Sequence, residues 1–162
     1  MLMIKIYTIG VYNSTEDSYF AKLIDHKIDL FLDIRQRRGI RGSLYKYVNS
    51  NYLQAKLKEL NILYEYIKEL APTKEIRQKQ KDADKLKGET KKQRTSLGSV
   101  FANEYRKQIL DTFDIDALAN KLFSLHVENV VLFCVEEHAE ACHRSLVAKE
   151  LANKLNTEII NL

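Results

Sequence analysis

Residues 133–151 gather the side chains of this 162-residue chain that are most able to do chemistry. The stretch reads FCVEEHAEACHRSLVAKEL and sets two cysteines, two histidines, several acids and an arginine between an apolar run and an amphipathic one. Thiols, imidazoles and carboxylates bind metals, act as nucleophiles and transfer protons. The stretch therefore offers a metal centre, a reactive thiol, an anion pocket, or only the junction of a strand and a helix.

A metal centre would draw its ligands from Cys134, His138, Cys142 and His143. Their mixture of soft and borderline donors suits zinc, but a structural zinc site usually takes a close pair of ligands from each of two turns. Cys134 is expected within a strand, and the adjacent Cys142 and His143 are expected to point apart. The spacing therefore predicts no metal. The lack of a GxGxxG or Walker-type loop argues against a tightly held dinucleotide and a P-loop triphosphate site, and we expect no cofactor.

Cys142 is the candidate for a reactive thiol, because it directly precedes a predicted helix. The helix N–H groups, the helix dipole and nearby Arg144 would all favour its thiolate. Glu136 or Asp33 would then be the proton-transfer group. Cys134, in an apolar strand, is expected to be a core cysteine with a raised pKa. The predicted catalytic residues are Cys142, Glu136 and Asp33.

An anion pocket is the third interpretation of the same stretch. A helix N-terminus attracts phosphate through its orphan N–H groups, and a guanidinium in the first turn adds a bidentate donor. Together with residues expected at neighbouring strand ends, this predicts a set of anion-binding residues: Arg35, Arg144, His143, Ser145, Thr8 and Gly10.

A basic loop gives an alternative function. No Asp or Glu occurs from Ile34 to Lys58, and RQRRGIRGSLYKY interleaves arginines with glycines and tyrosines. Charge and stacking surface of this kind suit single-stranded nucleic acid. In this alternative the Cys-His-Arg motif only builds the fold, with His143 and Arg144 bonding to strand-end carbonyls and Glu136. The contact residues would be Arg37, Arg38, Arg41, Tyr45, Lys46 and Tyr47.

The elements that must position these residues alternate along the chain. Short β-branched and aromatic runs predict strands, and amphipathic runs with N-capping residues predict helices. The first two strands are expected to pair in parallel through a right-handed crossover. We expect strands over 2–9, 28–35, 61–67, 129–136 and 157–162, and helices over 13–26, 52–60, 97–110, 115–125 and 143–155.

This alternation predicts a three-layer α/β fold, with a mainly parallel central sheet of about five strands and helices on both faces. One domain over residues 1–162 is expected. The lysine-rich segment 71–96 is interpreted as an exposed helix or a flexible flap within that domain, from which Lys74 and Arg77 could reach a cleft.

The polar clusters then share one location. Gly10 follows the first predicted strand, Asp33 and Arg35 end the second, residues 64–68 end the third, and residues 134–143 follow the fourth. Ligands of open parallel sheets bind beyond the carboxyl ends of the strands. The sequence therefore predicts a single cleft lined by residues far apart in the chain.

Composition narrows the class of protein further. The chain is 45% hydrophobic and 30% charged, with a net charge of +4. These values are ordinary for a soluble domain and allow a small anionic or phosphate-bearing ligand, or nucleic acid, as partner. No window is long and apolar enough to cross a bilayer, and no secretory leader is evident, so we expect a cytoplasmic protein with no membrane partner and free thiols.

Several short segments carry a family resemblance: YTIG near the start, DIR after the second strand, LYEYIKELAPTKEIR, FANEY, and Cys134-Val-Glu136 followed by Cys142-His143-Arg144. Together they resemble domain of unknown function family 488, over essentially the whole chain. The resemblance implies a compact α/β protein of bacterial or archaeal type and no established reaction. By resemblance, the signature positions are Thr8, Gly10, Asp33, Arg35, Glu136, Cys142, His143 and Arg144.

Overall fold

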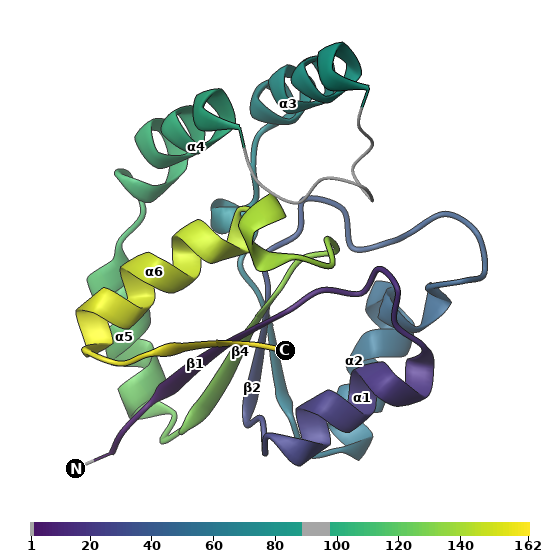
Figure 1. Ribbon diagram of the computed structural model, residues 1–162. Coiled ribbons are helices and arrows are strands. Elements are labelled where there is room, and N and C mark those ends of the chain that lie inside the picture. Colours follow the sequence, from purple (N-terminus) through teal and green to yellow (C-terminus); the bar gives the residue numbers. More distant parts are fainter. Residues whose placement is uncertain (1, 89–97) are drawn as a thin grey trace.

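A five-stranded, all-parallel sheet forms the centre of the molecule (Figure 1). The computed structural model describes residues 2–88 and 98–162. The strand order is β3-β2-β4-β1-β5. All five predicted strands are present, each shorter than its predicted range: β1 Lys5–Ile9, β2 Leu30–Asp33, β3 Leu63–Tyr66, β4 Asn129–Phe133 and β5 Ile159–Asn161.

Helices cover both faces of the sheet (Figure 1). Helices α1 (Glu16–Asp25) and α2 (Ser50–Glu59) lie on one face, and α5 (Ile115–Ser124) and α6 (Arg144–Leu155) lie on the other. Successive residues of a strand point to opposite faces, so the two faces carry separate apolar clusters. The predicted three-layer α/β fold is therefore confirmed.

Local sequence signals fix several of these helices. Thr15 caps α1, and its side chain forms a reciprocal capping box with Ser18. Asp114 caps α5 by accepting a hydrogen bond from the N–H of Ala117. Such caps satisfy N–H groups that have no partner inside the helix. The helix starts are consequently set by single polar side chains that precede each apolar pattern.

Two further helices lie beyond the carboxyl ends of the strands (Figure 1). Helix α3 (Lys74–Lys87) begins after Thr73, whose side chain accepts from the N–H of Ile76. Helix α4 (Ser99–Tyr105) continues into a π-helical segment, Arg106–Leu110. The lysine-rich segment is thus helical over residues 74–87. The rest of the predicted flap, residues 89–96, lies outside the described residues.

The predicted pairing of the first two strands was wrong. Strand β4 lies between β1 and β2, so that Val131 is opposite Tyr7 on one side and Phe31 on the other. Residues Val130 to Phe133 are all fully buried, which suits a central strand covered on both faces. A crossover rule fixes the handedness of a parallel connection, but it does not require the two strands to be neighbours.

The connections that follow β2 and β4 run to opposite faces of the sheet. The chain passes from β2 to α2 on one face, and from β4 to α6 on the other (Figure 1). Adjacent parallel strands whose connections diverge in this way leave a crevice at their carboxyl ends. The fold therefore places the expected cleft between β2 and β4.

Within the described residues, no helix combines the length and the apolar character that a membrane span requires.

Candidate functional site

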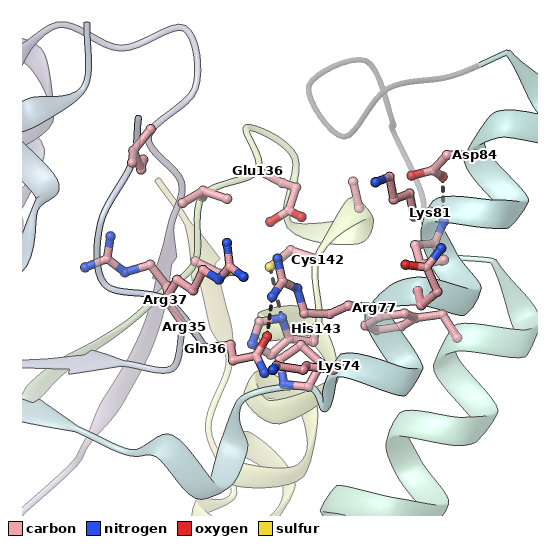
Figure 2. Close-up of a pocket in the computed structure, with 18 of the residues that line it drawn as sticks. Arg35, Gln36, Arg37, Lys74, Arg77, Lys81, Asp84, Glu136, Cys142 and His143 are labelled. Atoms are coloured by element: carbon pink, nitrogen blue, oxygen red, sulfur yellow. Dashed lines mark hydrogen bonds between the residues drawn. The ribbon is translucent and has the colours of Figure 1, made fainter. Parts of the chain in front are cut away.

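A cavity of about 1170 Å³ opens at the divergence of β2 and β4 (Figure 2). Three stretches contribute most of its wall: residues 35–41 after β2, residues 72–85 around α3, and residues 134–143 after β4. The predicted convergence of the second and fourth strand ends is thereby confirmed. Gly10 and residues 64–68, which were expected in the same cleft, do not line it.

The floor of the cavity holds a buried ion pair. Asp33 accepts two hydrogen bonds from the Arg35 guanidinium, from Nε at 2.9 Å and from Nη2 at 2.8 Å. It also accepts the Arg35 backbone N–H at 3.2 Å and the Tyr64 hydroxyl at 2.8 Å. Burial raises the pKa of Tyr64 to about 12, so this hydroxyl stays a donor at neutral pH. Asp33 does not line the cavity and serves to position Arg35.

Arg35 keeps one donor free of the ion pair. Its side chain is 3% exposed, and Nη1 is buried with no hydrogen-bond partner in the part of the chain that the structure describes. Burial disfavours the charged form, but the hydrogen bond and charge of Asp33 outweigh burial and raise the pKa of Arg35. The guanidinium is therefore a permanent cation at the cavity floor.

Positive charge dominates the cavity wall. Among the described lining residues, seven are basic and three are acidic. Figure 2 shows Lys74, Arg77 and Lys81 extending from the α3 side of the cavity. Lys74 and Arg77 were expected to reach a cleft, whereas Lys81 and Lys85 were missed. The spacing of the four residues over three helical turns is the signal that identifies a common face of α3.

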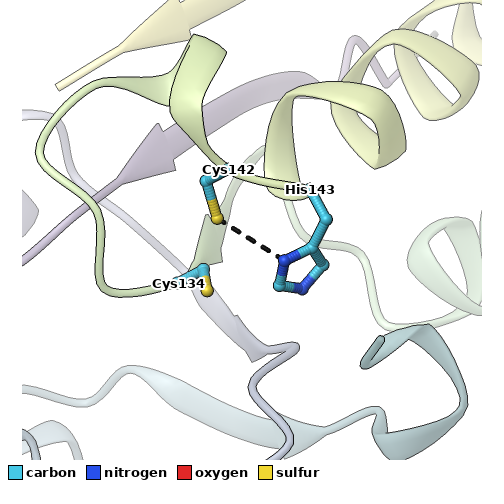
Figure 3. Close-up of side chains that lie close together, drawn as sticks. All are labelled: Cys134, Cys142 and His143. Atoms are coloured by element: carbon cyan, nitrogen blue, oxygen red, sulfur yellow. Dashed lines mark hydrogen bonds between the residues drawn. The ribbon is translucent and has the colours of Figure 1, made fainter. Parts of the chain in front are cut away.

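Cys134, Cys142 and His143 form a buried cluster beside this wall (Figure 3). Cys142 Sγ lies 3.6 Å from His143 Nδ1, and the ligating atoms of all three residues lie within 4.8 Å of one another. The expectation that Cys142 and His143 point apart is therefore wrong. Cys142 has extended backbone while His143 already has helical dihedrals, and this change of direction brings the two side chains together.

His138 takes no part in the cluster. Its side chain is 52% exposed and lies 3.8 Å from the Glu137 carboxylate. The four-residue zinc set considered from the sequence is thus reduced to three residues that could hold a metal.

The pKa of Cys142 is raised, whereas the sequence predicted a stabilised thiolate. Burial raises it well above the ordinary value, the neighbouring Cys134 raises it further, and Arg144 offsets only part of this shift. The first-turn N–H of Ser145 donates to the Cys142 carbonyl oxygen at 3.2 Å rather than to the sulfur. The helix N-terminus therefore does not activate this thiol. Cys134 is buried, as predicted.

His143, directly before α6, contacts the residue that follows β2. Its Nε2 lies 2.9 Å from the carbonyl oxygen of Ile34, which can only accept. Burial acts to lower the pKa of His143, but Cys134, the Ile34 carbonyl and Glu136 outweigh burial and raise it. Nε2 therefore carries a proton in either charge state, and Nδ1, on the other side of the ring, faces Cys142 Sγ.

Arg144 and Ser145 have structural partners. Arg144 is 1% exposed and donates from Nη1 to the Glu136 carbonyl oxygen at 2.6 Å, and from Nη2 to that of Glu137 at 3.3 Å. Ser145 Oγ donates to the Cys142 carbonyl oxygen at 2.9 Å. Neither residue lines the cavity. These contacts match the interpretation of the Cys-His-Arg motif as a builder of the fold.

Gly10 and Thr8 do not line the cavity either. A Cβ on Gly10 would lie 1.8 Å from the Glu136 carbonyl oxygen and 3.2 Å from Arg144 Nη1. The glycine is therefore required by the close passage of the loop after β4. Thr8 is fully buried and donates from Oγ1 to Asn161 Oδ1 at 2.6 Å, which ties β1 to β5. From the predicted anion-binding set, only Arg35 and His143 line the cavity.

Only some residues of the basic loop after β2 line the cavity. Arg37 and Arg41 line the cavity, whereas the Arg38 guanidinium lies 4.2 Å from the ring centre of Tyr66. Tyr45 and Tyr47 are buried, at 6% and 4% exposed, and so offer no stacking surface for bases. Lys46 is exposed but lies outside the cavity wall. The predicted nucleic-acid contact set is therefore wrong in its aromatic part.

Comparison with known proteins decides the family. The family model described as Domain of unknown function DUF488 matches residues 15–151. The chain belongs to this family. The match covers most of the DUF488 signature positions named above, from Asp33 to Arg144, and begins after Thr8 and Gly10. No curated protein and no solved structure matches the chain.

The Gly10 substitution tests the close passage of the two loops. Gly10→Ala places a methyl group where the Glu136 carbonyl lies, so the free energy of unfolding should fall by at least about 2 kcal/mol. Gly39→Ala is the control, because its Cβ would meet its nearest atom at an ordinary 3.7 Å. Urea unfolding of both variants measures the difference. Equal stability of the two variants would contradict this role of Gly10.

The pH dependence of alkylation tests the state of Cys142. Because burial raises its pKa, the thiol should stay neutral at pH 7 and react far more slowly in the folded, chelator-treated protein than in urea. Its labelling rate should rise only at pH values above the ordinary range for a cysteine. Peptide-resolved mass spectrometry measures this rate. Rapid labelling of the folded protein near pH 6 would show an activated thiolate instead.

Proposed function

We propose that this DUF488 protein binds a small anionic, phosphate-bearing ligand in the cavity, with Arg35 as the principal contact. The observation that carries the proposal is the buried Nη1 donor of Arg35 at the cavity floor. A buried donor without a partner is costly, and a charged hydrogen bond to a phosphate oxygen would remove that cost. Because Asp33 already fixes the guanidinium, little side-chain freedom is lost when a ligand binds.

The surrounding charge supports an anion rather than a neutral ligand. Arg37, Arg41 and the basic face of α3 add positive charge around Arg35. A cleft lined by one sign of charge raises the local concentration of ligands of the opposite sign. Its volume is slightly above the range usual for small-molecule pockets, which leaves room for a ligand larger than inorganic phosphate.

An enzymatic role would rest on two other lining residues. Glu136 and Cys142 both line the cavity. Glu136 stays the candidate for the proton-transfer group, whereas Cys142, whose raised pKa keeps it a neutral thiol, would need a neighbouring group to take its proton before it could act as a nucleophile. Asp33 no longer qualifies, because it is committed to Arg35 and lies off the cavity wall. We also expect a cytoplasmic location, where reducing conditions keep both cysteines as free thiols.

Nucleic acid is the second candidate, and Arg37 and Arg41 in the cavity wall favour it. Recognition would then depend on the phosphate backbone alone, since Tyr45 and Tyr47 are buried. Backbone recognition has a distinct signature, because counterions are released in proportion to the phosphates contacted. A steep fall of oligonucleotide affinity with salt would support this candidate.

Binding measurements with matched variants test the proposal. Inorganic pyrophosphate, a panel of mononucleotides and a short single-stranded oligonucleotide are titrated by calorimetry. Arg35→Lys keeps the charge beside Asp33 but lacks the forked donor, so the tightest phosphate probe should bind about tenfold more weakly or worse. Lys81→Gln removes a cavity charge and should weaken binding about twofold to fivefold.

The control is Lys79→Gln, on the same helix but outside the cavity wall, where Lys79 pairs with Glu75. It should bind as the wild-type protein does. If the wild type binds none of these probes, or if a folded Arg35→Lys protein binds them unchanged, the proposal is wrong. If Arg35→Lys fails to fold, phosphate binding is measured instead with the double variant Lys74→Gln/Lys81→Gln, which changes only exposed side chains. Unchanged affinity in that variant would contradict the proposal.

A further inference from the structure

We propose that Cys134, Cys142 and His143 form a zinc site with one coordination position open to the cavity. The proposal does not depend on anion binding. All three side chains are buried, and their ligating atoms, two Sγ and the imidazole nitrogen, lie within 4.8 Å of one another. Two thiolates and an imidazole match the donors that Zn²⁺ takes in proteins.

The spacing of the cluster fits tetrahedral coordination. With Zn–S and Zn–N bonds of about 2.3 and 2.0 Å, sulfur and nitrogen ligands lie about 3.5 Å apart. Cys142 Sγ and His143 Nδ1 are 3.6 Å apart (Figure 3). No two of the three ligating atoms are more than 4.8 Å apart, so a pair at that limit needs a closure of about 1 Å to reach the separation of about 3.5 Å for sulfur and nitrogen or about 3.8 Å for two sulfurs.

The surroundings orient two of the three ligands. Metal-binding histidines usually donate their other ring N–H to a carbonyl or carboxylate, and His143 Nε2 has this contact with the Ile34 carbonyl. Cys142 is held by a backbone bond from its N–H to the Ala139 carbonyl at 3.1 Å, in the 3₁₀ turn Ala139–Ala141. Arg144 holds the same loop through its hydrogen bond to the Glu136 carbonyl oxygen.

The fourth position would face the cavity. All three ligands line the cavity wall, so the side of the cluster that is not occupied by protein donors opens toward Arg35 and α3. Three protein ligands with an open position are the arrangement of zinc sites that bind water or a substrate oxygen. Zinc binding would release the proton of each thiol and form two Zn–S bonds, so affinity should fall as the pH is lowered.

A disulfide between Cys134 and Cys142, formed when an oxidant takes two electrons and two protons from the thiols, is the main competing outcome, since the two sulfurs lie within 4.8 Å of each other. The position of His143 favours the metal. A disulfide makes no use of the imidazole, whereas Nδ1 is aimed at the sulfurs and held there from the far side of the ring.

Metal analysis of the wild-type protein is the first test. Protein produced with zinc and purified under mild reduction should hold one zinc ion per chain. Co²⁺ exchanged into the site should give the thiolate charge-transfer band and the intense visible bands of tetrahedral cobalt. Zinc should slow alkylation of both cysteines below the already slow rate of the folded, chelator-treated protein, and a chelator should restore that baseline rate.

Variants then assign the ligands. Cys134→Ser, Cys142→Ser and His143→Gln should each lower zinc affinity, measured by chelator competition, by more than the roughly 10–100-fold that loss of a supporting hydrogen bond costs. His138→Gln is the matched control, because His138 is exposed and lies outside the cluster. It should bind zinc as tightly as the wild type.

Three results would overturn the proposal: reduced, folded wild-type protein that takes up neither zinc nor cobalt; recovery of Cys134 and Cys142 as a disulfide from rapidly acid-quenched cells; or variants that keep wild-type affinity. Since the first two are measured on unaltered protein, a variant that fails to fold does not weaken the test. Loss of phosphate binding in Arg35→Lys with zinc retained would separate this site from the anion site.

Discussion

The hydrogen bonds from Arg144 to the carbonyl oxygens of Glu136 and Glu137 anchor the loop on which the cysteine–histidine cluster depends. They fix the loop after β4 against β1, where only glycine fits at position 10. This loop carries Cys134 at one end and Cys142 at the other. Without that anchor, an irregular ten-residue segment would have to bring two sulfurs and an imidazole together at a large cost in conformational entropy.

Two buried arginines play different parts because their partners differ. Arg144 donates to neutral carbonyl oxygens and does not line the cavity, so it serves to hold the backbone of the loop at Glu136 and Glu137. Arg35 is paired with a carboxylate and keeps a donor at the cavity floor. A buried cation needs strong partners in either case. Each arginine has one buried donor without a partner among the described residues, Nη1 of Arg35 and Nε of Arg144, but only Arg35 lines the cavity and can also serve a ligand there.

The sequence was sufficient for the layers and for the general location of the site. Strand and helix periodicity predicted the α/β fold, and the strand-end rule brought Arg35 and Cys142 to one cleft. It could not reveal that β4 separates β1 from β2, since pairing partners depend on packing over the whole chain. Nor could it reveal that Tyr45 and Tyr47 turn inward, because a tyrosine suits a core and a surface equally well.

Helix α3 forms one wall of the cavity without belonging to the three layers. It is joined to α4 by the ion pair of Lys79 with Glu104. Tyr105 of α4 also donates a hydrogen bond to the carbonyl oxygen of Leu70, which precedes α3 in the chain. The cluster of Cys134, Cys142 and His143, by contrast, lies between the end of β4 and the start of α6. Substitutions on the cavity face of α3 would therefore change the charge that an incoming ligand meets without removing either thiol or the imidazole.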